Sequence, residues 1–474
     1  MGNESLLDVS THFGDDLDMF LLSKGLVKTR STKVRWLVLT LACLCGFGSY
    51  YCYDLPQPLQ SMLVTDVKIS TVKYDLLYSA YSLPNIILPF FGGIITDKLG
   101  VGKTMTIYSL FIIFGQLICT LGALFGRFSL LVTGRILFGI GGESLGVVQS
   151  VIAAKWFKGK ELAFALGMFL CFGRIGNIAN SSISPRAYFW VGGHLWGPFL
   201  LGSLTCIGSM FAGSSMASLD EKADLEEGET GRGDSDDGFK WGDLKKFKLI
   251  FYLLLINCGL YYGASAGLVN NLNDLLVQRF GFTPQSAGDA IIIVHAFALM
   301  VTPLFGFYSD YRGGKLTIIL LSYLILFGLH GVLAYLPDSH SGQVTKPILA
   351  LLISLGLTTA AYGAVFWPCV PLIVRQNLTG TAYGLAGASY NLMLAVVPLV
   401  VGGIHEKTVS KKEGYYWTEV LLGGMSFVGI LFTIWVLVVD RRTGRKLEKP
   451  GSEIEKESLL RVRFRSLSRI NLRR

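Results

Sequence analysis

The sequence is poor in charged residues for its length. Of its 474 residues only 16% are charged, whereas 51% are hydrophobic and the mean hydropathy is +0.50. A soluble domain carries about 25% charged residues, so this chain has too little polar surface to cover itself in water. The shortage of charge argues against a soluble domain and predicts that much of the surface faces lipid.

The sequence also lacks the residue patterns of metal, disulfide and catalytic sites. Its 8 cysteines fall mostly inside apolar runs, show no metal-ligand spacing and form no dense extracellular framework. No nucleotide-binding loop, metal cluster or catalytic triad is recognisable. We therefore predict that the protein is not an enzyme and uses no metal or cofactor.

Nucleic acid is not a predicted partner either. The formal net charge of +9 comes largely from the C-terminal tail, and no nucleic-acid-binding module is visible. Basic residues beside apolar runs are typical of segments that contact anionic lipid headgroups. The charge pattern therefore predicts the lipid bilayer, and no nucleic acid, as a partner.

Long apolar runs are what the sequence has in abundance. A run of about 20 apolar residues is long enough to cross a bilayer core. The first 33 residues are polar and contain no cleavable signal peptide, so the first span is expected to act as its own insertion signal. We predict twelve membrane-spanning helices, at about residues 35–55, 74–96, 104–125, 129–156, 161–183, 194–218, 247–268, 285–308, 316–336, 345–367, 380–404 and 416–439.

Basic residues in the short connections predict the orientation of these spans. Cytosolic loops carry an excess of lysine and arginine. The even-numbered turns and the start of the tail are rich in them, whereas only the last odd-numbered loop is basic, so both termini are predicted to be cytosolic. The residues concerned are Lys98, Lys103, Lys155, Lys158, Lys160, Arg312, Lys315, Arg441, Arg442, Arg445 and Lys446.

An acidic, glycine-rich segment divides the spans into six and six. Residues 220–238 contain almost no apolar side chains, so they are not expected to bury enough surface to fold. We predict a cytosolic N-terminal tail (1–33), an N-terminal six-helix bundle (34–219), a cytosolic acidic linker (220–244), a C-terminal six-helix bundle (245–439) and a basic cytosolic tail (440–474).

The two halves carry the same turn between their second and third spans. One copy contains Asp97 and Lys98, and the other contains Asp310 and Arg312; both read Gly-x-x-x-Asp, then a basic residue, glycine and lysine. Two copies at matching positions indicate an internal duplication. The aspartates and basic residues are predicted to form a gating latch between helix ends on the cytosolic face.

This turn resembles the signature loop of the major facilitator superfamily. The resemblance implies an all-α membrane protein with two six-helix bundles, a substrate site between them at mid-membrane, and transport by alternating access. Further strings resemble the lysosomal dipeptide transporters within that superfamily. These strings are Gly46–Asp54, Gly134–Leu145, Trp156–Glu161, Arg174–Gly176 and Gly380–Gly384.

The resemblance implies what the protein carries and where. A dipeptide uniporter of the lysosomal membrane is the expectation, with the plasma membrane as the alternative location. It also implies a glycosylated single-span accessory protein. In the tail, Glu455, Leu459 and Leu460 match an acidic dileucine sorting signal, which adaptor complexes bind.

Two opposite charges lie midway along the fourth and fifth predicted spans, Glu143 and Arg174. A charge at the bilayer centre costs about 2.5–3.5 kcal/mol on insertion scales, so such residues usually face the bundle interior. A dipeptide is a zwitterion; Glu143 is predicted to bind its ammonium and Arg174 its carboxylate. The alternative is a structural ion pair that only fixes helix packing.

Tyrosines form a second group of predicted substrate contacts. Tyr50, Tyr81 and Tyr383 combine an apolar face with a hydroxyl, which suits tolerant contact with peptides. Plain packing or an interfacial belt is the alternative for each.

Three further polar residues within the spans have two interpretations each. Asp54 and Arg135 are expected either to pair as a luminal gate or to extend separately to the interface. His295 is interpreted either as a proton sensor or as a hydrogen-bonding residue between helices.

Two other functions remain compatible with the sequence. One is a carrier for another organic solute, such as a sugar, an organic anion or a drug, with or without proton coupling. The other is a ligand sensor that does not transport. The short linker and tail contain no recognisable signalling module, which favours transport.

Overall fold

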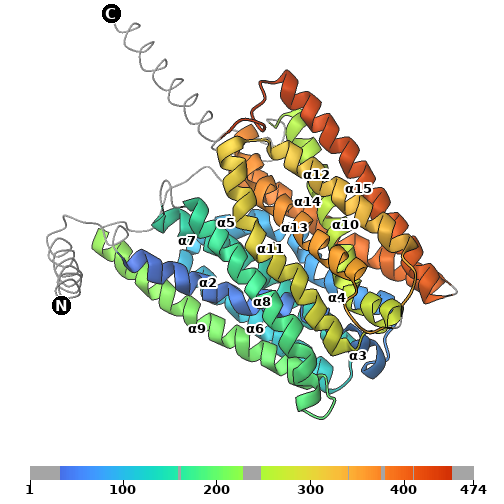
Figure 1. Ribbon diagram of the computed structural model, residues 1–474. Helices are drawn as coiled ribbons and strands as arrows, with labels where there is room; N and C mark the ends of the chain where they lie inside the picture. The colour runs from blue at the N-terminus through green and yellow to red at the C-terminus, as the bar shows by residue number, and fades with distance from the viewer. Residues whose placement is uncertain are drawn as a thin grey trace, which may run out of the picture.

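The computed structural model describes residues 33–157, 162–227, 247–339, 341–374, 379–408 and 410–450. These segments are helical and contain no strand (Figure 1). The N-terminal half consists of α2 (Val34–Tyr53), α3 (Gln60–Asp66), α4 (Thr71–Ser82), the 3-10 turn η2 (Pro84–Ile86), α5 (Leu88–Leu99), α6 (Val101–Leu124), α7 (Phe128–Trp156), α8 (Leu162–Trp190) and α9 (Trp196–Glu227). The C-terminal half consists of α10 (Leu249–Phe280), α11 (Pro284–Arg312), α12 (Lys315–Tyr335), α13 (Lys346–Ile373), α14 (Thr379–Lys407) and α15 (Lys411–Arg442).

Each predicted span coincides with one helix, except that the second is built from α4, η2 and α5 in succession. Pro84 interrupts it because proline has no N–H to donate to the preceding turn. The amide of Asn85 donates to the Tyr81 and Gly139 carbonyls, both at 3.0 Å, and so supplies donors at the break. Ten helices of the described segments are long and apolar enough to cross a membrane, which confirms an all-α membrane protein.

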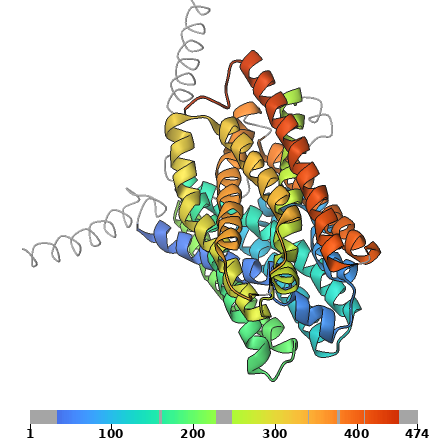
Figure 2. The same cartoon turned by 45° about the vertical axis from the view of Figure 1, so that its right-hand side comes forward.

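The helices form two bundles, each with its own hydrophobic core. One core contains residues from Val38 to Ala223, and the other contains residues from Phe247 to Leu447. The bundles lie side by side, one blue to green and the other yellow to red (Figures 1 and 2). Their main contacts join α4 to α14 and α8 to α11.

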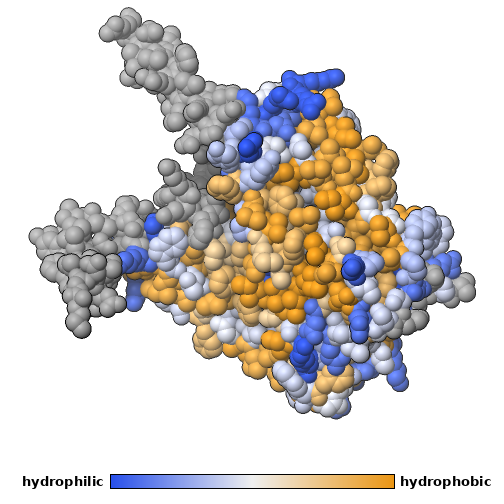
Figure 3. Space-filling model, viewed as in Figure 1, coloured by the Kyte–Doolittle hydropathy of each residue, from blue (hydrophilic) through white to orange (hydrophobic). Residues whose placement is uncertain are grey.

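The outer surface of both bundles is apolar. Large side chains such as Phe211 on α9 and Leu304 on α11 are about two-thirds exposed, at 65% and 66%. Figure 3 shows a broad hydrophobic area that crosses the visible face between more polar ends. Because so much apolar surface is unfavourable in water, this area is suited to contact with lipid.

Helix α9 continues beyond the point at which the linker was predicted to begin. Lys155 Nζ lies 2.7 Å from both Asp220 Oδ2 and Asp224 Oδ2, and the Trp156 indole donates to Asp220 Oδ1 at 2.7 Å. These partners on α7 hold the acidic residues in helical form through Glu227. The prediction of an unfolded linker from residue 220 is therefore wrong for its first eight residues, 220–227; residues 228–246 lie outside the described residues.

The predicted basic tail also begins with an ordered segment. Helix α15 runs to Arg442, and Leu447 beyond it is fully buried. The Glu448 carboxylate accepts hydrogen bonds from the backbone N–H groups of Leu316 and Thr317, at 2.8 and 3.2 Å, and so caps α12. The N-terminal tail and the dileucine residues Glu455, Leu459 and Leu460 lie outside the described residues.

Hydrogen bonds join the two bundles at the end of the molecule that carries α3, which we call the α3 end. Tyr74 Oη donates to the Asn270 carbonyl at 2.9 Å, and Gln60 Nε2 donates to Asn271 Oδ1 at 2.9 Å. Further contacts there are the Gln57–Val269 and Asn271–Asp75 hydrogen bonds and the Arg186–Asp289 ion pair. The bundles are therefore closed against each other at the α3 end.

Candidate functional site

Glu143 and Arg174 lie at mid-helix on α7 and α8, and both are half-buried. Within the described segments no ion pair joins them, so the structural-pair alternative has no support. The Glu143 carboxylate instead accepts hydrogen bonds from two tyrosines. Tyr390 Oη lies 2.5 Å from its Oε2, and Tyr81 Oη lies 3.4 Å from its Oε1.

The Tyr390 hydrogen bond crosses from one bundle to the other. Tyr390 belongs to α14 of the C-terminal bundle, whereas Glu143 and Tyr81 belong to the N-terminal bundle. A hydrogen bond to a charged group is worth about 1.5–3 kcal/mol, more than one between neutral groups. Glu143 therefore links the two bundles in this structure.

Close helix approach shapes the surroundings of both charges. A Cβ on Gly142 would come within 2.6 Å of Tyr81 Oη, and one on Gly173 would meet the Tyr50 ring at 3.1 Å. These glycines let Tyr81 and Tyr50 lie directly beside the helices that carry the charges. The structure thus brings the predicted contacts Tyr50 and Tyr81 to the Arg174 and Glu143 regions.

The Arg174 guanidinium has no hydrogen-bond or ion-pair partner in the part of the chain that the structure describes. It is close enough to act electrostatically on Tyr50, Asp54, Tyr262 and His295. An arginine normally directs its donors at a carboxylate or carbonyl. Arg174 is thus a half-buried cation whose donors remain available to a ligand.

Tyr383 lies outside the immediate surroundings of the two charges. It is 37% exposed, and its hydroxyl donates to the Trp367 carbonyl at 3.3 Å. It precedes Tyr390 by seven residues, or about two turns, on the same face of α14. Tyr390, which contacts Glu143 directly, is therefore the tyrosine of α14 that our selection of site residues missed; the seven-residue spacing was the available signal.

Aromatic side chains of the C-terminal bundle surround Tyr390. The Tyr262 ring lies 5.1 Å from the Tyr390 ring and the Trp367 ring lies 6.0 Å from it, measured between centroids. The Trp367 indole donates to the Tyr262 hydroxyl at 3.1 Å. These three residues, from α10, α13 and α14, form a half-buried aromatic wall that combines apolar faces with polar groups.

The predicted gate between Asp54 and Arg135 is not formed in the described structure. Arg135 is 2% exposed and donates to the carbonyls of Cys52, Tyr53 and Leu77 at 3.0–3.1 Å. The last carbonyls of a helix lack partners within it, so the guanidinium completes the end of α2 and joins it to α4. Asp54 and Arg135 are both buried, so the alternative prediction, that each side chain extends to the membrane interface, is also wrong. Arg135 instead joins two helices of the N-terminal bundle.

The second repeated turn does not form the predicted latch between Asp310 and Arg312 in the described structure. Arg312 is exposed and has no ion pair within the described residues, whereas Lys315 Nζ lies 3.8 Å from Asp310 Oδ1 and donates to the Ser309 carbonyl at 3.1 Å. Lys315 is the cation that this turn buries. The side chains of Asp97 and Lys98 in the first turn lie outside the described residues.

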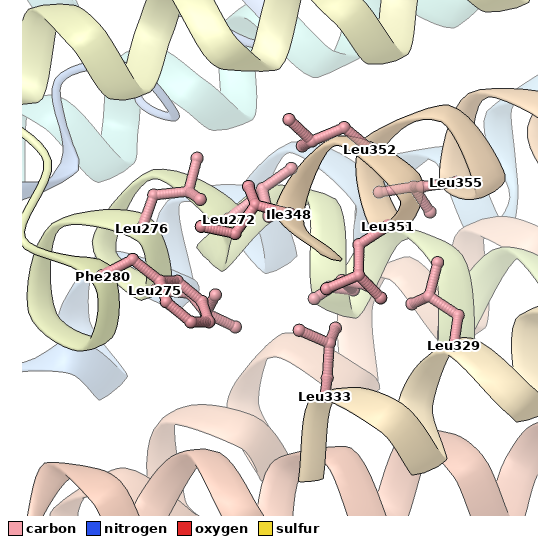
Figure 4. A pocket seen from close by; sticks show the side chains of 11 residues that line it. Leu272, Leu275, Leu276, Phe280, Leu329, Leu333, Ile348, Leu351, Leu352 and Leu355 are labelled. Atoms are coloured by element: carbon pink, nitrogen blue, oxygen red, sulfur yellow. The ribbon is translucent and has the colours of Figure 1, made fainter. Parts of the chain in front are cut away.

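A separate pocket in the C-terminal bundle is purely apolar (Figure 4). It has a volume of about 20 Å³ and is lined by leucine, isoleucine and phenylalanine side chains of α10, α12 and α13, including Leu272, Leu333 and Leu352. It offers a charged ligand no hydrogen-bonding partner. The polar groups around Glu143 and Arg174 therefore form the better candidate site.

Comparison with known families agrees with this architecture. The family model described as Major Facilitator Superfamily matches residues 42–398 and 258–471. The chain belongs to the major facilitator superfamily.

Relatives within the superfamily are similar over almost the whole chain. The chain is 33% identical to lysosomal dipeptide transporter MFSD1 of Bos taurus over 438 residues, which cover 90% of each protein. It is also 33% identical to lysosomal dipeptide transporter MFSD1 of Homo sapiens over 434 residues, covering 89% of this chain and 90% of the relative. The resemblance noted from the sequence strings is thereby confirmed.

A solved structure supports the fold alone. A point mutant of the nucleoside transporter NupG superposes with a TM-score of 0.68 at 14% identity, covering 84% of this chain and 99% of that one. At this low identity its substrate says nothing about the substrate of this chain. The two-bundle superfamily fold is what the two proteins share.

Proposed function

We propose that this superfamily member is a dipeptide uniporter that moves dipeptides from the lysosome lumen to the cytosol by alternating access. The observation that carries the proposal is the pair of unlike charges, Glu143 and Arg174, at mid-helix and unpaired with each other in the described structure. Similarity to the MFSD1 transporters supports the substrate class and the membrane.

Each charge suits one end of a zwitterion. The Glu143 carboxylate has lone pairs left for an ammonium group beside the Tyr390 and Tyr81 hydroxyls. The Arg174 guanidinium has free donors for a carboxylate, which it can bind in bidentate fashion. The aromatic wall of Tyr262, Trp367 and Tyr390 offers apolar faces to varied side chains, so binding depends mainly on the backbone termini.

The closed α3 end supports alternating access. The excess of basic residues in the other connections supports a luminal position for the α3 end. The structure then represents a carrier closed to the lumen, and loading from the lumen requires the bonds at Gln60, Tyr74 and Asn271 to break. We propose that residues 34–219 and 245–439 move as the two bodies, with the repeated turns at Asp97–Lys98 and Asp310–Lys315 as cytosolic switch elements.

Uptake into proteoliposomes tests the proposed function. Dipeptides are expected to be taken up in preference to free amino acids and without an imposed proton gradient. Glu143→Gln and Arg174→Ala should each abolish most uptake, because each leaves one charged terminus of the peptide without its counter-charge. Glu413→Gln and Arg127→Ala, at exposed positions, are the matched controls.

Three results would contradict the proposal. Full uptake by both Glu143→Gln and Arg174→Ala would remove these residues from the site. Uptake of a sugar, an organic anion or a drug, driven by protons and indifferent to dipeptides, would identify a different carrier. Tight dipeptide binding without exchange across the membrane would instead identify a sensor.

Delivery and assembly form a separate part of the proposal. We assign lysosomal sorting to Glu455, Leu459 and Leu460, through adaptor complexes, and protection in the lumen to a glycosylated single-span accessory protein. Replacing Leu459 and Leu460 by alanine should move a tagged carrier to the plasma membrane without loss of transport. Unchanged lysosomal location would contradict the sorting assignment.

A further inference from the structure

Two helices of different bundles cross closely where α8 meets α11. A Cβ built on Gly288 of α11 would lie 2.4 Å from the Ser181 carbonyl oxygen of α8, so the two backbones nearly touch there. The two helices run antiparallel, because α8 is an odd-numbered span and α11 an even-numbered one. Moving seven residues, about two turns, away from the α3 end along each helix therefore keeps the same faces opposed. The residues reached are Arg174 on α8 and His295 on α11.

His295 has an unusual environment for a polar side chain in a membrane helix. It is 3% exposed, and neither Nδ1 nor Nε2 has a hydrogen-bond partner among the described residues. An imidazole always carries at least one N–H, and leaving a buried donor unpaired costs about 1–3 kcal/mol. The Arg174 guanidinium acts on this ring electrostatically and also lacks a hydrogen-bond or ion-pair partner in the described segments.

The helix register thus brings Arg174 and His295 to the same level of the α8–α11 crossing, and neither side chain has a hydrogen-bond partner in the part of the chain that is described. A neutral imidazole has one acceptor nitrogen that could receive a guanidinium N–H, but neither ring nitrogen of His295 has a partner among the described residues, and its own N–H would remain unpaired in any case. An anion placed between the two groups would accept a hydrogen bond from each of them. A planar carboxylate has two oxygens with about four lone-pair sites, enough for a guanidinium on one side and an imidazole N–H on the other. The pair therefore has the chemistry of a carboxylate site.

We propose that His295 and Arg174 together bind the carboxylate of the substrate, one donor from each bundle. The inference rests on the proposed function and adds a residue that determines specificity. It means that the substrate carboxylate, once bound, holds α8 and α11 together. A peptide without a free carboxylate would leave both donors unpaired and would be rejected for that reason.

The amino end of the substrate would meet a matching arrangement. Glu143 lies in the N-terminal bundle and its partner Tyr390 in the C-terminal bundle, 2.5 Å apart. With His295 opposite Arg174, each terminus of a dipeptide would contact both bundles. Closure of the bundles around the ligand would then require both termini at once, which favours a zwitterion over an amine or an acid alone.

Nearby polar groups offer a competing explanation. Asn177, three residues after Arg174 on α8, also has a buried Oδ1 without a partner in the described segments, and this oxygen is an alternative acceptor for the His295 N–H in a helix-packing contact. The Asp54 carboxyl group is also close enough to interact electrostatically with Arg174. If His295 has a purely structural role, replacing it should lower the stability of the protein by the same amount with every ligand. If His295 binds the carboxylate, replacing it should lower the affinity for ligands with a free C-terminal carboxylate more than the affinity for ligands without one.

Ligand-dependent stabilisation of the purified full chain separates these roles. The probes are alanylalanine and alanylalanine amide, titrated against wild type, His295→Leu and His295→Gln. We expect wild type to bind the free acid more tightly, and His295→Leu to lose about tenfold or more in affinity for the acid with a much smaller loss for the amide. His295→Gln keeps an N–H donor and should recover part of the preference for the acid.

A double-mutant cycle with Arg174→Gln completes the test. If both residues bind one carboxylate, their effects on the preference for acid over amide will not be additive. The control is His330→Gln, because the buried His330 pairs with Glu419 at 2.6 Å on the far side of the C-terminal bundle. It should lower stability and leave the preference unchanged.

The outcomes distinguish a failure of the proposed transport function from a failure of the proposed role of His295. If wild type binds neither probe and no other dipeptide, the proposed function itself fails. If wild type prefers the acid and His295→Leu keeps the same preference, the proposed function stands and the role of His295 is refuted. Equal losses for acid and amide in His295→Leu would assign His295 to helix packing.

Discussion

The hydrogen bond between Tyr390 and Glu143 provides the most direct test of how the bundles are coupled. Tyr390→Phe removes one oxygen atom and leaves the ring and its contacts with Tyr262 and Trp367. The lost bond joins a hydroxyl to a carboxylate at 2.5 Å and links α14 to α7. Bonds of this kind contribute about 1.5–3 kcal/mol, so the ligand-free protein should unfold a few degrees lower.

The dipeptide should reduce this difference. An ammonium group bound at Glu143 supplies N–H donors in place of the hydroxyl that Tyr390→Phe lacks. Saturating alanylalanine should therefore bring the unfolding temperatures of wild type and Tyr390→Phe closer together. The assay is thermal unfolding followed by tryptophan fluorescence, with and without ligand. It requires no assumption about the rate-limiting step of transport.

Tyr383→Phe is the matched control for this prediction. Tyr383 lies on the same face of α14, but its hydroxyl bonds at 3.3 Å to the Trp367 carbonyl within its own bundle. Its removal should have a smaller effect, and the dipeptide should not reverse it. Equal deficits in the two variants, or a Tyr390→Phe deficit that persists undiminished at saturating dipeptide, would refute the coupling of Glu143 to the other bundle.

Three further predictions concern the scaffold around the site. Arg135→Lys should lower the unfolding temperature without selective loss of dipeptide affinity, because lysine cannot place three donors at once on the two carbonyls at the end of α2 and on the Leu77 carbonyl of α4; a selective affinity loss in a titration would contradict this. Asn271→Leu removes bonds to Gln60 and Asp75 and should weaken the seal at the α3 end, raising solvent-accessibility labelling there; unchanged labelling would oppose it. Lys155→Met should accelerate amide hydrogen exchange in the last turns of α9 only, since its ammonium joins them to α7; uniform acceleration would point to a global effect.

Much of the fold could be predicted because its signals are local. Each span is a continuous apolar run, and a run of that length is unfavourable anywhere except in a membrane or a core. The repeated turn at Asp97 and Asp310 shows the duplication for the same reason, since it is read from neighbouring residues. The acidic linker was mislocated at its start because Asp220 and Asp224 find their partner, Lys155, on another helix.

The residues of the candidate site could likewise be predicted only where their signals are local. Glu143 and Arg174 could be selected from sequence, because a charge inside an apolar run is conspicuous whatever the fold. Arg135 could be selected too, but its role could not be predicted: its partners are carbonyls, which every residue has and no sequence pattern marks. Tyr390 and His295 were visible as polar residues, and Tyr390 shares a helix face with Tyr383, but no local pattern showed which residues of the other bundle they would approach.

The amino-acid sequence by itself determined the all-helical membrane architecture, its division into two repeats, and the two mid-span charges, Glu143 and Arg174, around which the candidate site is built. These depend on hydrophobicity and charge along short stretches of chain. Only the tertiary structure decided that Tyr390 meets Glu143, residues 247 positions apart, and that α11, which carries His295, crosses α8, which carries Arg174. Such pairs depend on how the two bundles are placed against each other, and that placement results from packing over the whole interface.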